Sequence, residues 1–395
     1  MCYTLAMDKI EELLTRGVAN IIPNKEELKK LLASGKKLNV YLGIDPTAIK
    51  IHLGHAVVLR KLNEFAKLGH NVTFLIGDFT ALVGDTSDKD SERPILTPEE
   101  IEENFRTYKR QAEKILDFTT VKIRKNSEWL SKLNYAEVFK LKRQFSLNDF
   151  IGRELIKKRL SEGKTIRFDE TEYPIMQGYD SYFLDTDLQI GGTDQTFNMQ
   201  AGRTLQKKLK NKDSCILATE FLMGTDGRKM SKSWGNAIWL DDKPQDMFAK
   251  VMAINDALID QYFILATNED LKKIKEIKSG KKPMNAKKEL AKIIVTELYS
   301  EEDALSAKEN FEQTVQGEKL PDDIPVFQCS DRQNIIDLLV QTKLAASKSD
   351  AKRLIEQNGV TIDGKIVKLN ELTSLKNNSI IKAGKRRFVK IKITG

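Results

Sequence analysis

KKLNVYLGIDPTAIKIHLGHAVVLRKLNEFAKLGHNVTFLIGD, residues 36–78, reads as a strand, a helix and a second strand. Residues 36–44 end in an apolar, β-rich run that is typical of a buried strand. From His52 the apolar residues recur at helical spacing, and Gly69 ends that helix. Residues 71–78 predict the second strand. Because two strands joined by a helix favour a parallel sheet, we predict an α/β fold here.

Further along, the sequence predicts an interrupted sheet and then helices. A capping box that starts at Thr97 predicts a helix to about Leu116. Residues 117–170 are charged and mostly helical, and we interpret them as an insertion between two halves of the sheet. Residues 187–195 return to strand and loop, and after residue 233 the composition becomes helical.

The C-terminal part differs in charge from the rest of the chain. Residues 317–325 form a linker rich in Pro and Asp. Residues 334–360 then suggest two short helices, and Asp363-Gly364 between apolar runs predicts a hairpin. Residues 333–395 hold thirteen Lys and Arg against five Asp and Glu, which accounts for the whole net charge of +8. This asymmetry indicates a terminal module that binds a polyanion.

The chain of 395 residues is long enough for two or three domains, and 40% apolar with 31% charged residues is ordinary for a globular protein. We therefore predict a sheet domain at 1–235 with its insertion at about 117–170, a helical domain at 236–316, a linker at 317–332 and a small α+β domain at 333–395.

Neither secretion nor a membrane location is expected. No apolar run approaches the length of a membrane span, and acidic residues come early in the N-terminal sequence. Cys2, Cys215 and Cys329 are far apart in sequence, which argues against both a disulfide framework and a zinc site. We expect a cytoplasmic protein in a reducing compartment.

His52 and His55 are two of only three histidines in the chain, and they flank Gly54 at the start of the first predicted helix. They could simply lie on the helix surface, or they could share a metal ion, although no further ligands lie nearby. The third interpretation is anion binding, because a helix N-terminus offers free N–H groups to a phosphate. Gly54 would let a flat base approach the helix backbone. The position after a first strand is where doubly wound sheets bind nucleotides.

The KMSKS segment, residues 229–233, strengthens the nucleotide interpretation. Taken alone, a Lys/Ser cluster is usually a solvated loop. Here it follows Gly224 and Gly227, which favour a mobile loop. Lys229 and Lys232 would then bring two ammonium groups to a polyphosphate.

HLGH and KMSKS in this order resemble the motifs of class I aminoacyl-tRNA synthetases, and the chain as a whole is similar to the bacterial tyrosyl-tRNA synthetases. The resemblance also rests on YLGIDPTA, GDTSDKDSER, YPIMQGYD and QIGGTDQ. It implies a Rossmann-like catalytic domain, an anticodon-binding helical domain and a C-terminal RNA-binding domain like one first named for a small-subunit ribosomal protein. Leu53 is a mild departure, since the family more often has isoleucine there.

The resemblance implies a two-step reaction. Tyrosine and ATP, the latter with Mg²⁺, would give tyrosyl-adenylate and pyrophosphate, and the tyrosyl group would then pass to the 3′-terminal adenosine of tRNA(Tyr). No zinc is implied, and the connective insertion would form a homodimer interface. The residues implied to act in catalysis are His52, His55, Thr47, Lys229, Lys232, Ser233, Lys89 and Arg93.

A pocket for tyrosine is suggested by three polar residues of YPIMQGYD. Tyr173, Gln177 and Asp180 share one helix face, which could otherwise simply face water. The resemblance assigns tyrosine binding to Tyr41, Asp85, Tyr173, Gln177, Asp180 and Gln195. It assigns ATP binding to Gly43, Asp45, Gly54, Gly192, Asp194, Met230 and Ser231. Asp180 would bind the phenol, and phenylalanine would leave this buried carboxyl group unpaired.

The basic end of the chain would contact RNA phosphates through Lys382, Lys385, Arg386, Arg387, Lys390 and Lys392. Three other interpretations remain at this stage: a tryptophanyl-tRNA synthetase, a small-molecule nucleotidyltransferase, and an RNA-binding synthetase paralogue without activity. The nucleotidyltransferase would have no use for the basic module.

Overall fold

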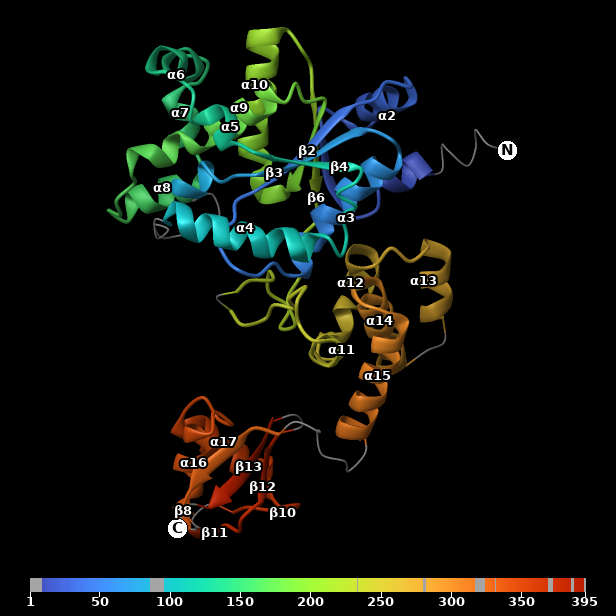
Figure 1. Ribbon diagram of the computed structural model, residues 1–395, viewed down its shortest axis with the longest axis vertical. Coiled ribbons are helices and arrows are strands. Elements are labelled where there is room, and N and C mark those ends of the chain that lie inside the picture. Colours follow the sequence, from blue (N-terminus) through green and yellow to red (C-terminus); the bar gives the residue numbers. More distant parts are fainter. Residues whose placement is uncertain are drawn as a thin grey trace. The chain divides into compact units, whose positions relative to one another are not determined.

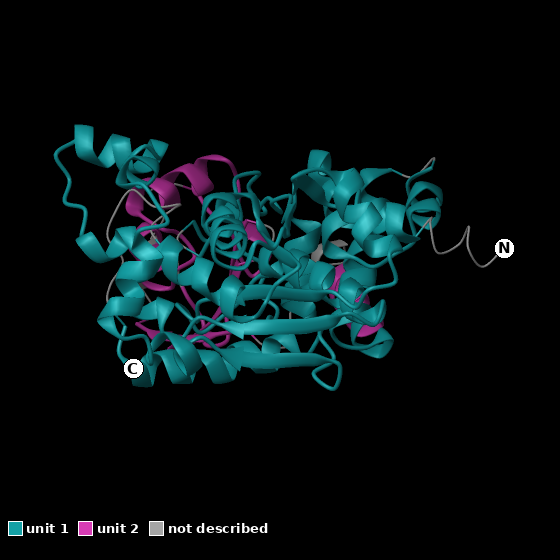
Figure 2. Cartoon of the chain, turned by 90° about the horizontal axis from the view of Figure 1, so that it is seen from above, with its two compact units in different colours: residues 1–304 teal, residues 305–395 magenta. Residues whose placement is uncertain are grey.

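The computed structural model describes residues 9–85, 96–232, 234–279, 282–316, 324–330, 332–368, 372–384 and 387–393. The chain forms two compact units, Met1–Ala304 and Leu305–Gly395, which Figure 2 shows in different colours. Among the described residues, no helix is both long enough and apolar enough to cross a membrane.

Unit 1 is built on a six-stranded sheet in the order β1-β6-β5-β2-β3-β4 (Figure 1). Its strands are β1 (Val18–Ile22), β2 (Asn39–Ile44), β3 (Asn71–Ile76), β4 (Val121–Lys125), β5 (Leu188–Gly192) and β6 (Cys215–Thr219). Only β1 pairs antiparallel, with β6. The predicted parallel α/β sheet is therefore confirmed. From β2 the chain proceeds to β3 and β4 toward one edge of the sheet, and from β5 it proceeds to β6 toward the other edge.

Two helices pack directly on this sheet. Helix α3 (Leu53–Lys67) connects β2 to β3, and α10 (Thr196–Lys210) connects β5 to β6. Right-handed crossovers that progress in opposite directions place α3 and α10 on opposite faces of the sheet. Helix α9 (Tyr173–Phe183) packs against α10. The carboxyl ends of β2 and β5 then lie at the switch point where such sheets bind ligands.

The insertion is shorter than the sequence suggested, because it begins after an additional strand. Residues Val121–Lys125 form β4, which pairs in parallel with β3 from Val72↔Val121 to Ile76↔Lys125. Its charged side chains are possible because β4 is an edge strand, and they obscured the strand pattern. The helices that follow are α5 (Ser127–Leu130), α6 (Tyr135–Lys142), α7 (Leu147–Ile151) and α8 (Glu154–Ser161).

Further helices belong to unit 1, most of them after the last strand of the sheet. They are α4 (Pro98–Ala112), which precedes β4, and α11 (Pro244–Met252), α12 (Ile259–Ala266), α13 (Leu271–Lys278) and α14 (Pro283–Leu298), while α15 (Glu301–Phe311) crosses the unit boundary. Helices α11, α12 and α13 all pack on α14, and α12 also packs on α3. The helices are thereby joined to the sheet within one compact unit.

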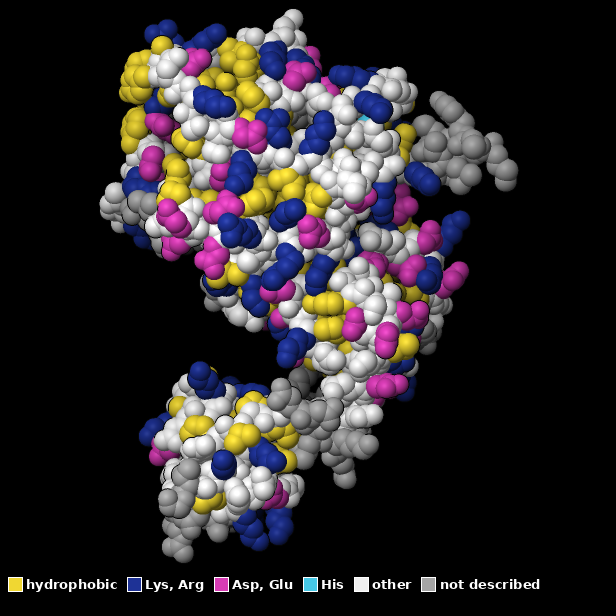
Figure 3. Space-filling view, in the orientation of Figure 1, with side chains coloured by type: hydrophobic (Ala, Val, Ile, Leu, Met, Phe, Trp, Pro, Cys, Tyr) yellow, Lys and Arg dark blue, Asp and Glu magenta, His cyan; other side chains and the backbone are white. Residues whose placement is uncertain are grey.

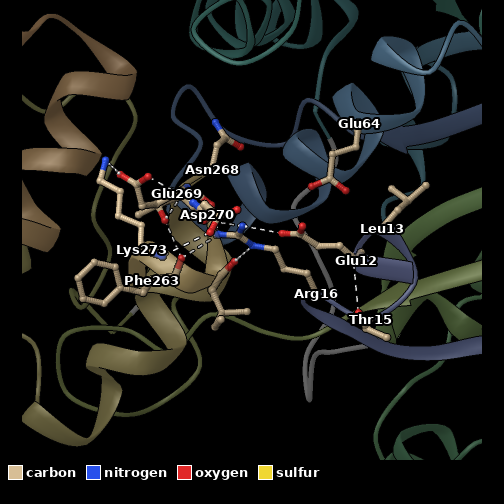
Figure 4. A network of polar contacts seen from close by, with 12 residues as sticks. Glu12, Leu13, Thr15, Arg16, Glu64, Phe263, Asn268, Glu269, Asp270 and Lys273 are labelled. Carbon is tan, nitrogen blue, oxygen red and sulfur yellow. Dashed lines mark hydrogen bonds and ion pairs between the residues drawn. The ribbon is translucent and has the colours of Figure 1, made fainter. Parts of the chain in front are cut away.

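Arg16 ties the N-terminal part of unit 1 to the end of α12 (Figure 4). Its guanidinium donates hydrogen bonds to the carbonyl oxygens of Phe263, Ile264, Thr267 and Glu269, at 2.7–3.2 Å. The last carbonyl groups of a helix have no partner within the helix, and a cation there also complements the helix dipole. One side chain therefore caps α12 and fixes it next to β1.

Unit 2 contains a five-stranded sheet in the order β10-β9-β12-β13-β7, with helices α16 (Ile335–Gln341) and α17 (Lys348–Glu356). The strands are β7 (Val326–Cys329), β9 (Val360–Ile362), β10 (Lys365–Ile366), β12 (Ile380–Ala383) and β13 (Arg387–Ile393), while β8 (Arg332–Asn334) pairs separately with β11 (Leu372–Ser374). The predicted hairpin is confirmed: β9 and β10 pair across Asp363 and Gly364, whose φ angles are 49° and 81°.

We expect Arg16→Ala to lower the free energy of unfolding of unit 1 by about 3 kcal/mol, because the partly buried carbonyl groups of Ile264, Thr267 and Glu269 lose their Arg16 donor. Arg16→Lys should recover only part of this loss, since one ammonium group cannot reach all four carbonyls. Urea unfolding followed by tryptophan fluorescence measures it, because all three tryptophans lie in unit 1.

The matched control is Lys30→Ala, which removes an exposed cation in an i,i+3 pair with Glu27 and should cost less than about 0.5 kcal/mol. An Arg16→Ala protein with the wild-type urea midpoint would show that this contact does not hold α12.

Candidate active site

A cavity of about 470 Å³ opens at the carboxyl ends of β2 and β5. It is lined by every predicted catalytic, tyrosine-binding and ATP-binding residue that the structure describes. Lys89, Arg93 and Ser233 lie outside the described residues. The motifs are widely separated in sequence, so their convergence in one cavity is a result of the fold.

His52 and His55 use the same ring atom to cap α3. His52 is the N-cap residue, and its Nδ1 accepts a hydrogen bond from the backbone N–H of Gly54 at 3.1 Å. Nδ1 of His55 accepts one from the backbone N–H of His52 at 3.2 Å. Burial lowers the pKa of His52 to about 2 and that of His55 to about 4, and the positive charge of Lys229 contributes to both shifts. Both rings are therefore neutral near pH 7.

The caps also fix the tautomer of each ring. Because Nδ1 accepts an N–H, the single ring proton of each neutral imidazole is on Nε2, which can donate to a ligand. A Cβ atom at Gly54 would lie 2.9 Å from Cε1 and Nδ1 of His52. Gly54 thus leaves room for the capping ring, a reason that sequence analysis missed when it considered only access for a base.

The segment that enters α3 is held by two neighbouring parts of the chain. Leu53 donates its backbone N–H to Ile238 O at 2.9 Å, and Leu240 donates to Ile51 O at 3.0 Å. On the other side, Gln111 of α4 accepts from the N–H of Ile51 at 3.0 Å. The backbone before HLGH is therefore fixed from both sides.

Helix α4 supports the loop between β2 and α3 with further buried amides, none of them predicted. Asn104 donates to Pro46 O at 2.9 Å, and Gln111 donates to Ile49 O at 2.9 Å. Both side chains are buried. The available signal was their spacing of seven residues, which places them on one face of a capped helix. This loop carries Thr47, which lines the cavity.

Asp180 lies at the buried end of the cavity, 3% exposed. Its carboxyl group accepts hydrogen bonds from Trp129 Nε1 at 2.7 Å and Asn126 Nδ2 at 3.1 Å. Burial raises the pKa of Asp180 to about 8, the charges of Asp45 and Asp78 raise it as well, and the two hydrogen bonds oppose the shift. This carboxyl group can therefore be protonated at neutral pH, which the sequence did not predict.

Tyr41 lies beside Asp180. Its hydroxyl donates to Gln189 Oε1 at 3.2 Å, and burial raises the pKa of this phenol well above its usual value. Asn126, Trp129 and Gln189 were missed by sequence analysis. Asn126 and Trp129 belong to one segment, at α5, and Gln189 belongs to β5. None of them carries a local motif, so only the fold brings them to Asp180 and Tyr41.

The predicted tyrosine and ATP residues are connected by hydrogen bonds. The Tyr173 hydroxyl donates to Asp45 Oδ2 at 2.9 Å, which joins a predicted tyrosine contact to a predicted ATP contact. Gln195 Nε2 donates to Asp85 Oδ2 at 2.7 Å. Gln177 also lines the cavity. One hydrogen bond thus joins the two predicted sets, and the other joins two predicted tyrosine contacts.

Lys229 forms an ion pair with Asp194 at 3.1 Å, and its Nζ lies 4.1 Å from the centroid of the Phe221 ring. The sequence placed Lys229 at the phosphates and Asp194 at the ribose, so their direct pairing was not expected. Phe221 was not predicted either. Among the described residues, no group of three or more His, Cys, Asp or Glu side chains could hold a metal ion.

Four of the predicted RNA-binding residues are described, all in unit 2. Pairing of β12 with β13 sets Lys382 opposite Phe388, so Lys382, Lys390 and Lys392 share one face of the sheet. Arg387 pairs with Ala383 and falls on the other face. Lys385 and Arg386 lie outside the described residues.

Comparisons with known proteins agree with this geometry. Residues 33–316 match the family model of class I tRNA synthetases (W and Y), and residues 316–391 match the tyrosine–tRNA ligase SYY-like C-terminal domain. Tyrosine–tRNA ligases of Thermotoga maritima and Carboxydothermus hydrogenoformans are 41% and 43% identical to the chain; the alignments cover 96% of this chain in each case and 96% and 97% of the relatives. A crystal structure of tyrosyl-tRNA synthetase from Archaeoglobus fulgidus, complexed with L-tyrosine, is 26% identical with a TM-score of 0.60, and the match covers 76% of this chain and 99% of that one. The chain therefore belongs to the tyrosine–tRNA ligase family of class I tRNA synthetases.

Proposed function

We propose that the protein is a tyrosine–tRNA ligase whose cavity activates tyrosine with ATP before transfer to tRNA(Tyr). The observation that carries this proposal is the buried Asp180–Tyr41 end of a cavity whose other walls hold HLGH and KMSKS. The relatives are tyrosine–tRNA ligases, which favours tyrosine over tryptophan. The presence of both lysines and both histidines in the cavity favours an active enzyme over an inactive paralogue.

Activation of tyrosine needs no general base. The tyrosine carboxylate is already ionised, and its oxygen forms a bond to the α-phosphorus as the bond to the β-phosphate oxygen breaks. The enzyme has to align these groups and stabilise the charge on the departing pyrophosphate. Nε2–H of His52 and His55 would donate to phosphate oxygens, and Lys229 and Lys232 would add positive charge.

Mg²⁺ would enter with ATP as part of the substrate. Because the described residues offer no dedicated cluster of ligands, the phosphates themselves would hold the ion together with water. Binding of ATP would also separate the ion pair between Lys229 and Asp194. Asp194 would then accept from a ribose hydroxyl, and the Lys229 ammonium group would move to the phosphates.

Discrimination against phenylalanine would come from Asp180. In either protonation state its carboxyl group can hydrogen-bond a phenol, as a donor or as an acceptor. Phenylalanine would bury this group without a partner, which costs free energy that tyrosine does not lose. Tyr41 and Gln189 would complete the surroundings of the phenol oxygen.

In the second step, a hydroxyl of the terminal ribose would attack the tyrosyl carbonyl, and AMP would leave. We propose that the helical segment 236–316 binds the anticodon region and that unit 2 binds RNA phosphates through its basic residues. Lys392 and Arg387 are exposed, which supports such contacts. We place the reaction in the cytoplasm, where tRNA and ATP are both available.

We also propose a homodimer. Large apolar side chains are exposed along the insertion and on the neighbouring α9, and Figure 3 shows hydrophobic side chains gathered over the insertion helices. They are Tyr135, Phe139, Leu147, Ile151, Leu160, Phe168 and Phe183. An exposed apolar patch of this kind is typical of a protein–protein interface.

Amino-acid-dependent ATP–pyrophosphate exchange tests the activity. Tyrosine should support exchange, and the other amino acids should not do so appreciably. Asp180→Ala should lower kcat/KM for tyrosine by on the order of 100-fold. It should also lower the ratio of kcat/KM for tyrosine to kcat/KM for phenylalanine. This ratio does not depend on the fraction of folded enzyme, because both values come from one sample.

The control for Asp180→Ala is Asp185→Asn, which changes a half-exposed carboxylate just after α9 and should leave the ratio as in the wild type. If tryptophan rather than tyrosine supports exchange, the proposed substrate is wrong. An unchanged ratio in Asp180→Ala would remove Asp180 from the pocket.

Sedimentation equilibrium should give about twice the chain mass of 44.9 kDa. Phe168→Asp should weaken the dimer at least about tenfold, because it places a charge in an apolar contact. Met284→Asp, a change at another exposed apolar residue outside the insertion, should leave the dimer intact. A wild-type protein that stays monomeric at micromolar concentration would contradict the proposal.

Replacing Lys382, Arg387, Lys390 and Lys392 together by Gln should weaken tRNA binding and reduce its salt dependence. The slope of log affinity against log salt concentration should fall in magnitude by about one for each phosphate group that the protein no longer neutralises. Pyrophosphate exchange needs no RNA and should stay near the wild-type rate, which makes it the internal control. Unchanged tRNA affinity and salt slope would show that this surface does not bind the RNA.

A further inference from the structure

Asn236 is the centre of the loop that contains KMSKS, although it lies outside the motif. It is 2% exposed. Its Oδ1 accepts from the backbone N–H of Ser231 at 2.8 Å, and its Nδ2 donates to Lys229 O at 3.2 Å. The same amide nitrogen donates to Asp226 Oδ1 at 2.7 Å. One side chain thus binds the loop at three positions.

The backbone of the loop closes around this amide. Thr225 donates its N–H to Asn236 O at 3.1 Å, and Gly224 donates to Arg228 O at 2.7 Å. A Cβ atom at Gly224 would lie 2.4 Å from Cγ and Nδ2 of Asn236. Gly224 is therefore required for the close approach of the amide, whereas the sequence had suggested only a contribution to loop mobility.

We propose that Asn236 is a positioning residue that directs Lys229 of the KMSKS segment at the phosphates of ATP. The inference rests on the proposed function. The two ends of the amide hold the backbone at Lys229 and at Ser231, on either side of Met230, which is 3% exposed. With the backbone fixed at these points, the Lys229 side chain leaves the loop in one direction, into the cavity.

Only a side chain of this size with both a donor and an acceptor meets these requirements. Alanine makes none of the three hydrogen bonds. Aspartate keeps the acceptor for Ser231 N–H but loses both donors, and it sets a second carboxylate against Asp226, whose pKa is lowered to about 2 by Asn236 and Arg228. Glutamine is one methylene longer, so its amide would not lie where the Asn236 amide meets Ser231 N–H, Lys229 O and Asp226. Asn236→Asp is therefore a nearly isosteric test of the donor side.

The experiment measures single-turnover formation of tyrosyl-adenylate by the full-length chain. Asn236→Ala and Asn236→Asp should each lower the rate constant by on the order of 100-fold, because a misplaced Lys229 no longer meets the departing pyrophosphate. Tyrosine affinity should stay within about twofold, because the Asp180 pocket is made by other segments. Rates are referred to the concentration of sites that bind tyrosine, so partial unfolding does not imitate the effect.

A double variant separates positioning from general damage. If Asn236 acts through Lys229, the variant that combines Asn236→Ala with Lys229→Ala should have a rate constant little lower than that of Lys229→Ala alone. The control is Asn255→Ala, which removes another asparagine that accepts from a backbone N–H, outside the residues that line the cavity. It should keep the wild-type rate.

The inference would be overturned if the fold-decreases in rate constant of the two single variants multiply in the double variant. It would also be overturned if the Asn236 variants lose as much tyrosine affinity as activation rate. Wild-type rates in Asn236→Ala and Asn236→Asp would overturn it too. A wild-type chain without tyrosine-dependent activation would instead contradict the proposed function, so the two failures can be distinguished.

Discussion

The first turn of α3 has to satisfy its own backbone N–H groups while leaving polar groups available to a ligand. His52 and His55 meet this requirement because an imidazole has two nitrogens: Nδ1 caps the helix and Nε2–H remains for the cavity. The other parts of the site follow from this arrangement. Gly54 leaves space for the ring, residues 238–240 and α4 hold the incoming backbone, and the sheet places this turn at its switch point.

The electrostatics of the cavity follow from burial. The same low-dielectric surroundings lower the pKa of both histidines and raise that of Asp180, so these groups tend towards neutrality. The cationic side chains that line the cavity are Lys229 and Lys232, alongside the acidic Asp45, Asp85, Asp194 and Glu220. The interior therefore offers neutral donors, His52 and His55, while the cations Lys229 and Lys232 lie on a separate loop. This arrangement suits a reaction in which the tyrosine carboxylate attacks and the pyrophosphate anion leaves.

Strand–helix–strand periodicity predicted the sheet, because it is a local signal. Most of the residues that line the cavity were instead assigned by the resemblance to class I synthetases, which short motifs carry. The sequence did not predict β4, because this strand has only five residues and lies in a charged, mostly helical stretch, although VKIRK begins with the apolar/charged alternation of a strand. It also missed Trp129, Gln189 and Asn236. Their partners are at least five and up to 148 residues away, and a buried amide or indole has no pattern of its own until the fold supplies its partner. Asn236 could have been considered, since it closely follows KMSKS in the sequence. Its role, however, depends on the close approach of Gly224, which only the fold shows.

The N-terminal segment has a consequence for synthesis on the ribosome. β1 pairs only with β6, and Arg16 caps α12 through carbonyl groups as far along the chain as Glu269. The residues around β1 therefore have to wait for partners that are made some two hundred residues later. During that interval, the half of the sheet formed by β2, β3 and β4 can assemble from nearby strands, whereas β1 and its arginine stay without their native contacts. The segment around β1 is thus synthesised before its main partners and completes its native contacts late.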